Sequence, residues 1–95
     1  MKLTVTPAAI ECFKEQWGFK EGQHIRFFAR YGGCGSVQAS FSMGIAQEEP
    51  KEIALSTVEQ GMIFYVEQED MWYLNGQNLH VDYQPETEEI HFQVL

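Results

Sequence analysis

The sequence has little of what most small metal-binding or secreted proteins depend on. Its 95 residues include two cysteines, Cys12 and Cys34, and three prolines. Two thiols without a Cys-x-x-Cys pair do not make a zinc-finger pattern, and a structural disulfide is not expected in an intracellular chain of this size. No apolar run approaches the length of a membrane span, and no apolar signal region opens the chain. We therefore predict a cytoplasmic protein with no membrane association.

Basic residues are also scarce. Six Lys and Arg stand against 14 Asp and Glu, so the formal net charge is −8. Such a chain repels the phosphates of nucleic acids and of anionic membranes, whereas basic protein partners and metal cations remain compatible with it. The sequence has no phosphate-cradling loop, no paired-carboxylate signature and no nucleophile elbow. We therefore expect neither nucleic-acid binding nor enzyme activity.

Apolar residues, in contrast, are sufficient for a packed core. They make up 44% of the chain and include seven Phe, four Tyr and two Trp, which is not the composition of a disordered segment. A chain of this length has room for one core only, so residues 1–95 are expected to form a single domain.

The pattern near the N-terminus predicts a helix. Thr6 is a good N-cap, and Pro7 suits the first helical position. Ile10, Phe13 and Trp17 have the spacing of a buried stripe, and Gly18 is a natural stop. Cys12 lies near the edge of that stripe, where a packed thiol is a better interpretation than a metal ligand.

The rest of the chain alternates mainly as strands do. A helical turn with Met71, Trp72 and Leu74 as its apolar contacts is predicted over residues 68–74, and Asn75-Gly76 is the strongest turn signal. The predicted fold class is therefore α+β, mainly β with helices, with small and mostly antiparallel sheets packed against the N-terminal helix. The clearest strand patterns cover residues 24–30, 37–45, 62–66, 79–83 and 90–94.

Cys34 lies in a glycine-rich segment between two of these predicted strands, within the run Gly32-Gly33-Cys34-Gly35-Ser36. Three glycines in four positions give the backbone freedom and leave the thiol little covered. The functional interpretation is a thiolate that binds a metal, a cluster or a persulfide, with Arg30 as a nearby positive charge. The alternative is a hairpin with an incidental cysteine, because free cysteine often serves as a small apolar filler.

The three histidines are scattered. His24, His80 and His91 each fall on the polar face of a strand pattern, and exposed strand histidines are a better interpretation than metal ligands. Strands distant in the sequence can still meet, so a His–Cys pair with Cys34 remains open.

Taken in order, these segments resemble the HesB/IscA family, the A-type iron–sulfur scaffold and carrier proteins. The resemblance rests on the Thr6-Pro7 helix start, the Cys34 segment, Glu49-Pro50-Lys51, the strand Phe64-Tyr65-Val66 and the run from Trp72 to Gly76. It implies a compact fold of small sheets packed with helices. It also implies binding of iron or an iron–sulfur cluster across an oligomer, with Cys34 as a ligand. Family members add a Cys-Gly-Cys near the C-terminus and carry Ser-Gly after the thiol, whereas this sequence has Gly35-Ser36 and ends at Leu95 without that motif.

Three hypotheses follow. The first is a protein of iron–sulfur cluster assembly that binds iron or a cluster through Cys34, as a homo-oligomer or with an assembly or acceptor protein. The second is an interaction module of the same fold that binds no metal. The third is a thiol or sulfur-acceptor protein that uses Cys34.

Overall fold

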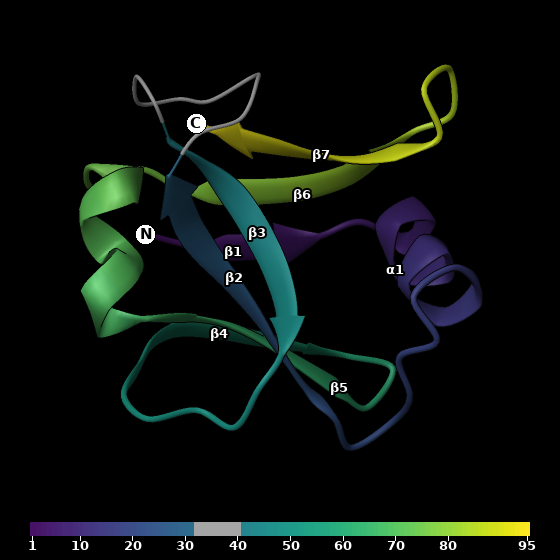
Figure 1. Ribbon diagram of the computed structural model, residues 1–95, viewed down its shortest axis with the longest axis horizontal. Coiled ribbons are helices and arrows are strands. Elements are labelled where there is room, and N and C mark those ends of the chain that lie inside the picture. The colour runs from purple at the N-terminus through teal and green to yellow at the C-terminus, as the bar shows by residue number, and fades with distance from the viewer. Residues whose placement is uncertain (32–40) are drawn as a thin grey trace.

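The computed structural model describes residues 1–31 and 41–95, which form seven strands and two helices (Figure 1). The predicted α+β class is confirmed. The elements in chain order are β1 (Leu3–Val5), α1 (Pro7–Glu15), β2 (His24–Tyr31), β3 (Phe41–Gln47), β4 (Ile53–Glu59), β5 (Met62–Glu67), the 3-10 helix η1 (Gln68–Leu74), β6 (Leu79–Gln84) and β7 (Glu89–Val94).

The strands form two mixed sheets. One has the order β1-β6-β7 and the other the order β3-β2-β5-β4. Three of the pairings are antiparallel, as expected, but β1 with β6 and β2 with β5 are parallel. The sequence pattern did not predict β1, because three residues are too few to show a period of two.

Helix α1 begins as predicted. The hydroxyl of Thr6 accepts a hydrogen bond from the backbone N–H of Ala9 at 3.2 Å, and Pro7 occupies the first turn. The prediction for Trp17 was wrong, since its side chain is 46% exposed. The helix ends at Glu15, so Trp17 no longer follows the helical stripe, and Phe19 takes the buried position beside Phe13.

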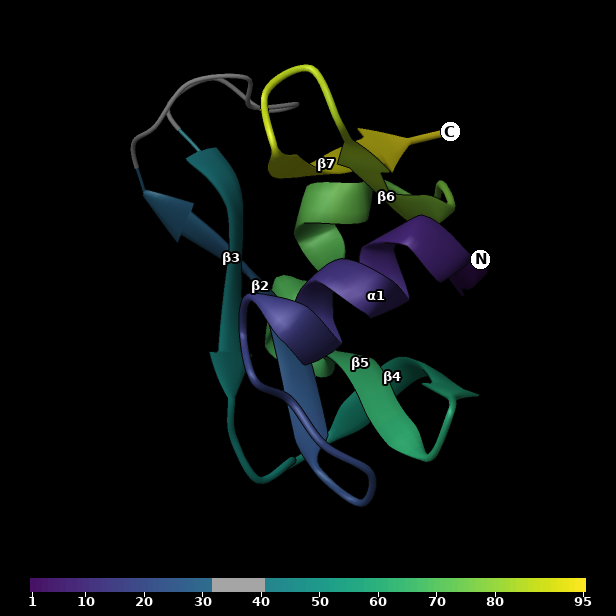
Figure 2. The same ribbon diagram turned by 90° about the vertical axis from the view of Figure 1, so that its right-hand side faces the viewer.

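The core between the two sheets is built around aromatic rings. Phe27 and Phe64, on neighbouring strands, stack with ring centroids 5.7 Å apart. Phe13 packs on Phe64 from the helix side at 5.4 Å, and Phe92 meets Phe27 edge-on from the other sheet. Offset and edge-on ring pairs of this kind add to the apolar burial. Helix α1 therefore lies against the same core that joins the two sheets (Figure 2).

The helical turn predicted over residues 68–74 is confirmed, and it is a 3-10 helix. With three residues per turn, positions i and i+3 share a side, so Asp70 and Tyr73 both face inward. Trp72 lies on the other side with Glu69 and is 51% exposed, which corrects its predicted role as a core contact. The turn signal at Asn75 is confirmed, since this residue ends η1 in the left-handed conformation.

The predicted strand over residues 37–45 is described only in part. Strand β3 begins at Phe41, while Val37 and Ala39 lie outside the described residues. In the part of the chain that the structure covers, no helix is long and apolar enough to cross a membrane.

Candidate functional site

Cys34, the predicted site residue, lies outside the residues that the structure describes. Its two flanking strands are described. Tyr31 and Phe41 are register partners at the ends of β2 and β3, and Arg30 pairs with Ser42 in the next row. The Arg30 Nε donates a hydrogen bond to the Ser42 hydroxyl at 3.3 Å. The segment that carries Cys34 therefore connects two strands whose antiparallel pairing continues to their ends.

The other cysteine, Cys12, is buried in helix α1 and only 6% exposed. Burial raises the pKa of its thiol, and the neighbouring carboxylate of Glu15 raises it further. A protonated and covered thiol is a poor nucleophile and a poor metal ligand. The prediction of a packed thiol is confirmed.

The fold brings two of the three histidines together. His91 lies opposite Asp82 across the β6–β7 pairing, and His80 is two residues from Asp82 on the same strand. His24 belongs to the other sheet. All three are half-buried rather than exposed. Within residues 1–31 and 41–95, no group of three or more His, Cys, Asp or Glu side chains is arranged to hold a metal ion.

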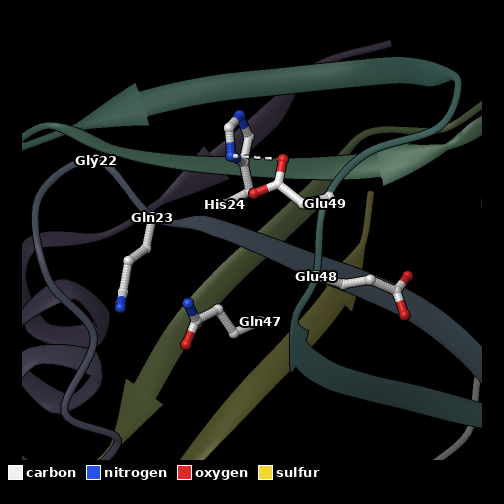
Figure 3. Close-up of a pocket in the computed structure, with 6 residues that line it drawn as sticks. All are labelled: Gly22, Gln23, His24, Gln47, Glu48 and Glu49. Atoms are coloured by element: carbon white, nitrogen blue, oxygen red, sulfur yellow. Dashed lines mark ion pairs between the residues drawn. The ribbon is translucent and has the colours of Figure 1, made fainter.

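His24 lines a polar depression of about 320 Å³ at the start of β2. Gln23, Gln47, Glu48 and Glu49 line the same depression, and Figure 3 shows the carboxylate of Glu49 facing the imidazole of His24. The His24 Nδ1 and the nearer carboxylate oxygen are 4.0 Å apart, and the Glu49 side chain is almost fully exposed. This is a solvated surface contact.

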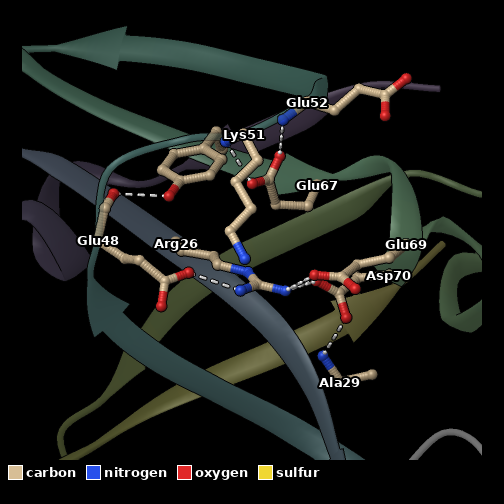
Figure 4. A network of polar contacts seen from close by, with 9 residues as sticks. Arg26, Ala29, Glu48, Lys51, Glu52, Glu67, Glu69 and Asp70 are labelled. Atoms are coloured by element: carbon tan, nitrogen blue, oxygen red, sulfur yellow. Dashed lines mark hydrogen bonds and ion pairs between the residues drawn. The ribbon is translucent and has the colours of Figure 1, made fainter.

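A cluster of charged side chains surrounds Arg26. The guanidinium lies between Glu48 on one side and Glu69 and Asp70 on the other (Figure 4). Its Nη1 donates to Glu48 at 2.6 Å, and its Nη2 donates to Glu69 at 2.9 Å and to Asp70 at 2.7 Å. Burial opposes the positive charge, but the hydrogen bonds to Asp70 and Glu48 outweigh it and raise the pKa of Arg26.

The carboxylates of this region also bind backbone groups. Asp70 accepts a hydrogen bond from the N–H of Ala29 on β2. Glu67, almost fully buried, accepts from the N–H groups of Lys51 and Glu52 at 2.7 Å each. Burial alone would raise the pKa of Glu67, but these two hydrogen bonds and the charge of Arg26 lower it. The acids thus join β2, η1 and the connection before β4.

Tyr65, a buried residue of β5, also contacts the cluster. Its hydroxyl donates to the carbonyl of Glu48 at 2.6 Å, and burial together with the charges of Glu67 and Glu48 raises its pKa to about 12. This cluster was not predicted from the sequence. Arg26 on the polar face of a strand was the one available signal, and its three acidic partners lie 22, 43 and 44 residues further on.

A smaller polar contact joins helix α1 to the three-stranded sheet. The hydroxyl of Thr6 donates to the carboxylate of Asp82 at 2.7 Å, and the N–H of Tyr83 donates to the same oxygen at 2.8 Å. The hydrogen bond from Thr6 is the main cause that lowers the pKa of Asp82, and the bond from Tyr83 adds to it. One threonine therefore caps the helix and holds it to β6.

An α+β fold of two small sheets packed with helices agrees with the fold that the predicted family resemblance implies. The family model for iron-sulphur cluster biosynthesis matches residues 1–94. The chain belongs to this family, which is the HesB/IscA family of the predicted resemblance.

Individual relatives extend the comparison. A Bacillus subtilis protein named pyruvate dehydrogenase inhibitor is 36% identical over 98% of both chains. An uncharacterized protein of Staphylococcus saprophyticus is 28% identical over 97% of both chains. The crystal structure of Escherichia coli SufA, described as involved in biosynthesis of iron-sulfur clusters, superposes with a TM-score of 0.64 at 22% identity. This match covers 98% of this chain and 80% of SufA, and it confirms the fold.

Proposed function

We propose that this protein takes part in iron–sulfur cluster assembly and holds iron or a cluster through Cys34. The observation that carries the proposal is the family match over residues 1–94, which includes the glycine-rich segment around Cys34. Cysteine thiolates are the usual ligands of iron–sulfur clusters, and glycines beside a thiol let a bulky inorganic group approach the backbone.

The number of thiols in the chain determines how many other ligands a bound cluster needs. Clusters are generally held by four cysteine ligands, and Cys34 contributes one per chain. Cys12 is buried in α1 with a raised pKa, so it is not a second ligand in the folded protein. The remaining ligands then come from a second copy, from an assembly or acceptor protein, or from an external thiol. A cluster shared in this way is suited to transfer, and the role needs no catalysis by the chain itself.

The test is anaerobic reconstitution with iron and sulfide, followed by visible absorption and by counts of iron and sulfide per chain. Wild type is compared with Cys34→Ser and with Cys12→Ala, which removes the other thiol as a matched control. We expect wild type and Cys12→Ala to take up iron and sulfide alike, and Cys34→Ser to lose the uptake while keeping its circular dichroism spectrum. Equal uptake by Cys34→Ser would contradict a role for this thiol.

A second candidate function is inhibition of pyruvate dehydrogenase by direct binding. The support for it is the Bacillus subtilis relative, which carries the name pyruvate dehydrogenase inhibitor and is 36% identical over almost the whole of both chains. It corresponds to the interaction-module hypothesis, and an acidic chain with a net charge of −8 is compatible with a basic protein partner.

The two candidates are separated by an activity titration. Purified pyruvate dehydrogenase complex is assayed with increasing amounts of metal-free wild type and of Cys34→Ser. Inhibition of equal strength by both forms would support binding that is independent of iron. Inhibition by the cluster-loaded wild type alone would mean that inhibition depends on the cluster, so both functions would use Cys34. No inhibition by any form would contradict the second candidate function.

A further inference from the structure

An open depression of about 180 Å³, which we call the η1 depression, lies where η1 begins (Figure 4). Glu52, Glu67 and Glu69 contribute three carboxylates to its lining, and Lys51 and Gln68 complete it. Pockets for drug-sized molecules occupy about 300–1,000 Å³, so the η1 depression is suited to one side chain of a partner rather than to a small-molecule ligand. Its three acids favour a side chain with a positive charge.

Glu67 distinguishes the η1 depression from an ordinary group of surface acids, because this residue is only 2% exposed. Burial opposes its ionisation, but the hydrogen bonds from the N–H groups of Lys51 and Glu52 and the charge of Arg26 lower its pKa. Each of the two backbone donors binds one oxygen of the carboxylate. A carboxylate oxygen can accept about two hydrogen bonds, so each oxygen keeps the capacity for a further donor.

The surroundings of the η1 depression carry an excess of negative charge. Six carboxylates belong to the connection between β3 and β4, the end of β5 and the start of η1, and the cations Arg26 and Lys51 offset two of them. The six acids are Glu48, Glu49, Glu52, Glu67, Glu69 and Asp70. The remaining four negative charges are half of the net charge of −8. This part of the surface therefore attracts a basic segment.

An exposed aromatic ring lies next to these acids. Trp72 follows Glu69 by three residues, which is one turn of a 3-10 helix, so the two side chains share a side of η1. Trp72 is 51% exposed. A guanidinium binds to the face of tryptophan, and arginine makes such contacts more often than lysine does. A guanidinium also donates hydrogen bonds in several directions at once, which suits a depression lined by separate carboxylates.

We propose that the η1 depression and Trp72 together bind an arginine side chain of an extended basic segment in a partner protein. The guanidinium donates to the carboxylates of the depression and stacks on the indole ring, and basic neighbours in the segment lie along the acidic connection after β3. This connection follows the end of β3, whereas the segment that carries Cys34 precedes its start. The contact involves no thiol, so it can be tested separately from metal binding.

The first measurement locates the binding of a defined probe. Isotope-labelled, metal-free protein is titrated with capped tetra-arginine, and the amide and indole chemical shifts are followed by NMR. Capped tetralysine and tetraglutamate serve as controls. We expect saturable shifts at the residues that line the η1 depression and at the Trp72 indole, with tighter binding of tetra-arginine than of tetralysine and no binding of tetraglutamate. Shifts spread evenly over all acids, shifts confined to the acidic β6–β7 turn, or equal affinities for the two basic peptides would overturn the proposal.

Matched charge variants then test the depression. Glu52→Gln and Glu86→Gln each remove one exposed carboxylate, the first at the η1 depression and the second in the β6–β7 turn. We expect the Kd for tetra-arginine to rise about threefold in the first and to stay unchanged in the second. Lys51→Met removes a cation that competes for the same carboxylates, so it should lower the Kd by about the same factor. Equal effects of the two Gln variants, or weaker binding by Lys51→Met, would contradict the proposal.

The two exposed tryptophans provide a second matched pair. Trp17 follows α1, which lies on the opposite side of the molecule from η1 in Figures 1 and 2. Trp72→Leu should raise the Kd for tetra-arginine about threefold, because the cation–π contact is lost, whereas Trp17→Leu should leave it unchanged. Circular dichroism checks that each variant is folded. An unchanged Kd in a folded Trp72→Leu variant, or an equal rise in both variants, would contradict stacking on Trp72.

Discussion

Two polar contacts hold helices to the sheets, and they differ in kind. Around Arg26, one guanidinium joins three acids that belong to η1 and to the connection after β3. At Thr6, a neutral hydroxyl meets the single carboxylate of Asp82. The first arrangement concentrates several charges around a guanidinium that is itself largely buried, so its parts depend on each other. The second is local and tolerates change better. The comparison indicates that substitutions at the polar contact of the four-stranded sheet cost more stability than those at the contact of the three-stranded sheet.

The largest effect is expected from Arg26→Met. Methionine keeps the apolar stem but leaves Asp70, whose side chain is 8% exposed, without its cation. Removing one partner of a buried ion pair costs about 3–5 kcal/mol, so we expect a loss of this size in the free energy of unfolding measured in urea.

The matched control is Arg30→Met, four positions further along β2, where the side chain is exposed and a loss of less than about 1 kcal/mol is expected. Adding Asp70→Asn to Arg26→Met should restore part of the stability, because the stranded charge is then removed. Equal losses in the two arginine variants would contradict a special role for the ion pairs of Arg26.

A smaller effect is expected from Thr6→Val. Valine has nearly the same shape but neither accepts from Ala9 nor donates to Asp82, so the helix loses its cap and its tie to β6. We expect a loss of about 1–2 kcal/mol, measured by thermal or urea unfolding. Thr4→Val on β1 is the control, with an expected change within about 0.5 kcal/mol. A loss for Thr6→Val as large as that for Arg26→Met would show that the two contacts are equally important.

The same hydrogen bond gives stability a dependence on pH. The pKa of Asp82 is lower in the folded protein than the unfolded value of about 3.9, so the folded state binds fewer protons between these two values. The contribution is therefore fully present above the unfolded pKa and is lost as the pH falls through the folded pKa. The stability difference between wild type and Thr6→Val should shrink over that acid range. A difference that stays constant from neutral pH into acid would mean that the carboxylate is not involved.

The smallest effect is expected within the Arg26 cluster itself. Glu69 is 66% exposed, and solvent screens its ion pair, so Glu69→Gln should lower the free energy of unfolding by less than about 1 kcal/mol. Asp70→Asn affects the same guanidinium nitrogen from a buried position and should cost more. Urea unfolding of the two variants compares them directly. A larger loss for Glu69→Gln would show that exposure does not rank these acids.

The elements with a clear local pattern could be predicted from the sequence. Thr6 and Pro7 marked the start of α1, alternation marked β2, β6 and β7, and a run of strand-forming residues marked β5. Very short elements, and elements whose repeat differs from that of an α-helix or a strand, could not be predicted. Strand β1 is too short for a pattern, and Trp72 was placed inside because a 3-10 helix has a shorter repeat than an α-helix.

Of the candidate site, only the segment around Cys34 could be proposed from the sequence. The family resemblance around Cys34 was confirmed by the match over residues 1–94, and the ligand role of Cys34 stays a prediction. The Arg26 cluster was missed because an ion pair between residues 22 to 44 positions apart leaves no local trace in the sequence. Only the pairing of β2 with β5 and the docking of η1 bring those groups together.

The burial of Cys12 makes this thiol a built-in reporter of unfolding. A thiol that is covered inside α1 and held protonated reacts with an alkylating reagent mainly after the helix has opened. In the Cys34→Ser background the chain carries that one thiol, so its labelling rate under native conditions reports how often the N-terminal part of the molecule opens. The same variant that tests metal binding thus also allows the rate of local opening around α1 to be measured.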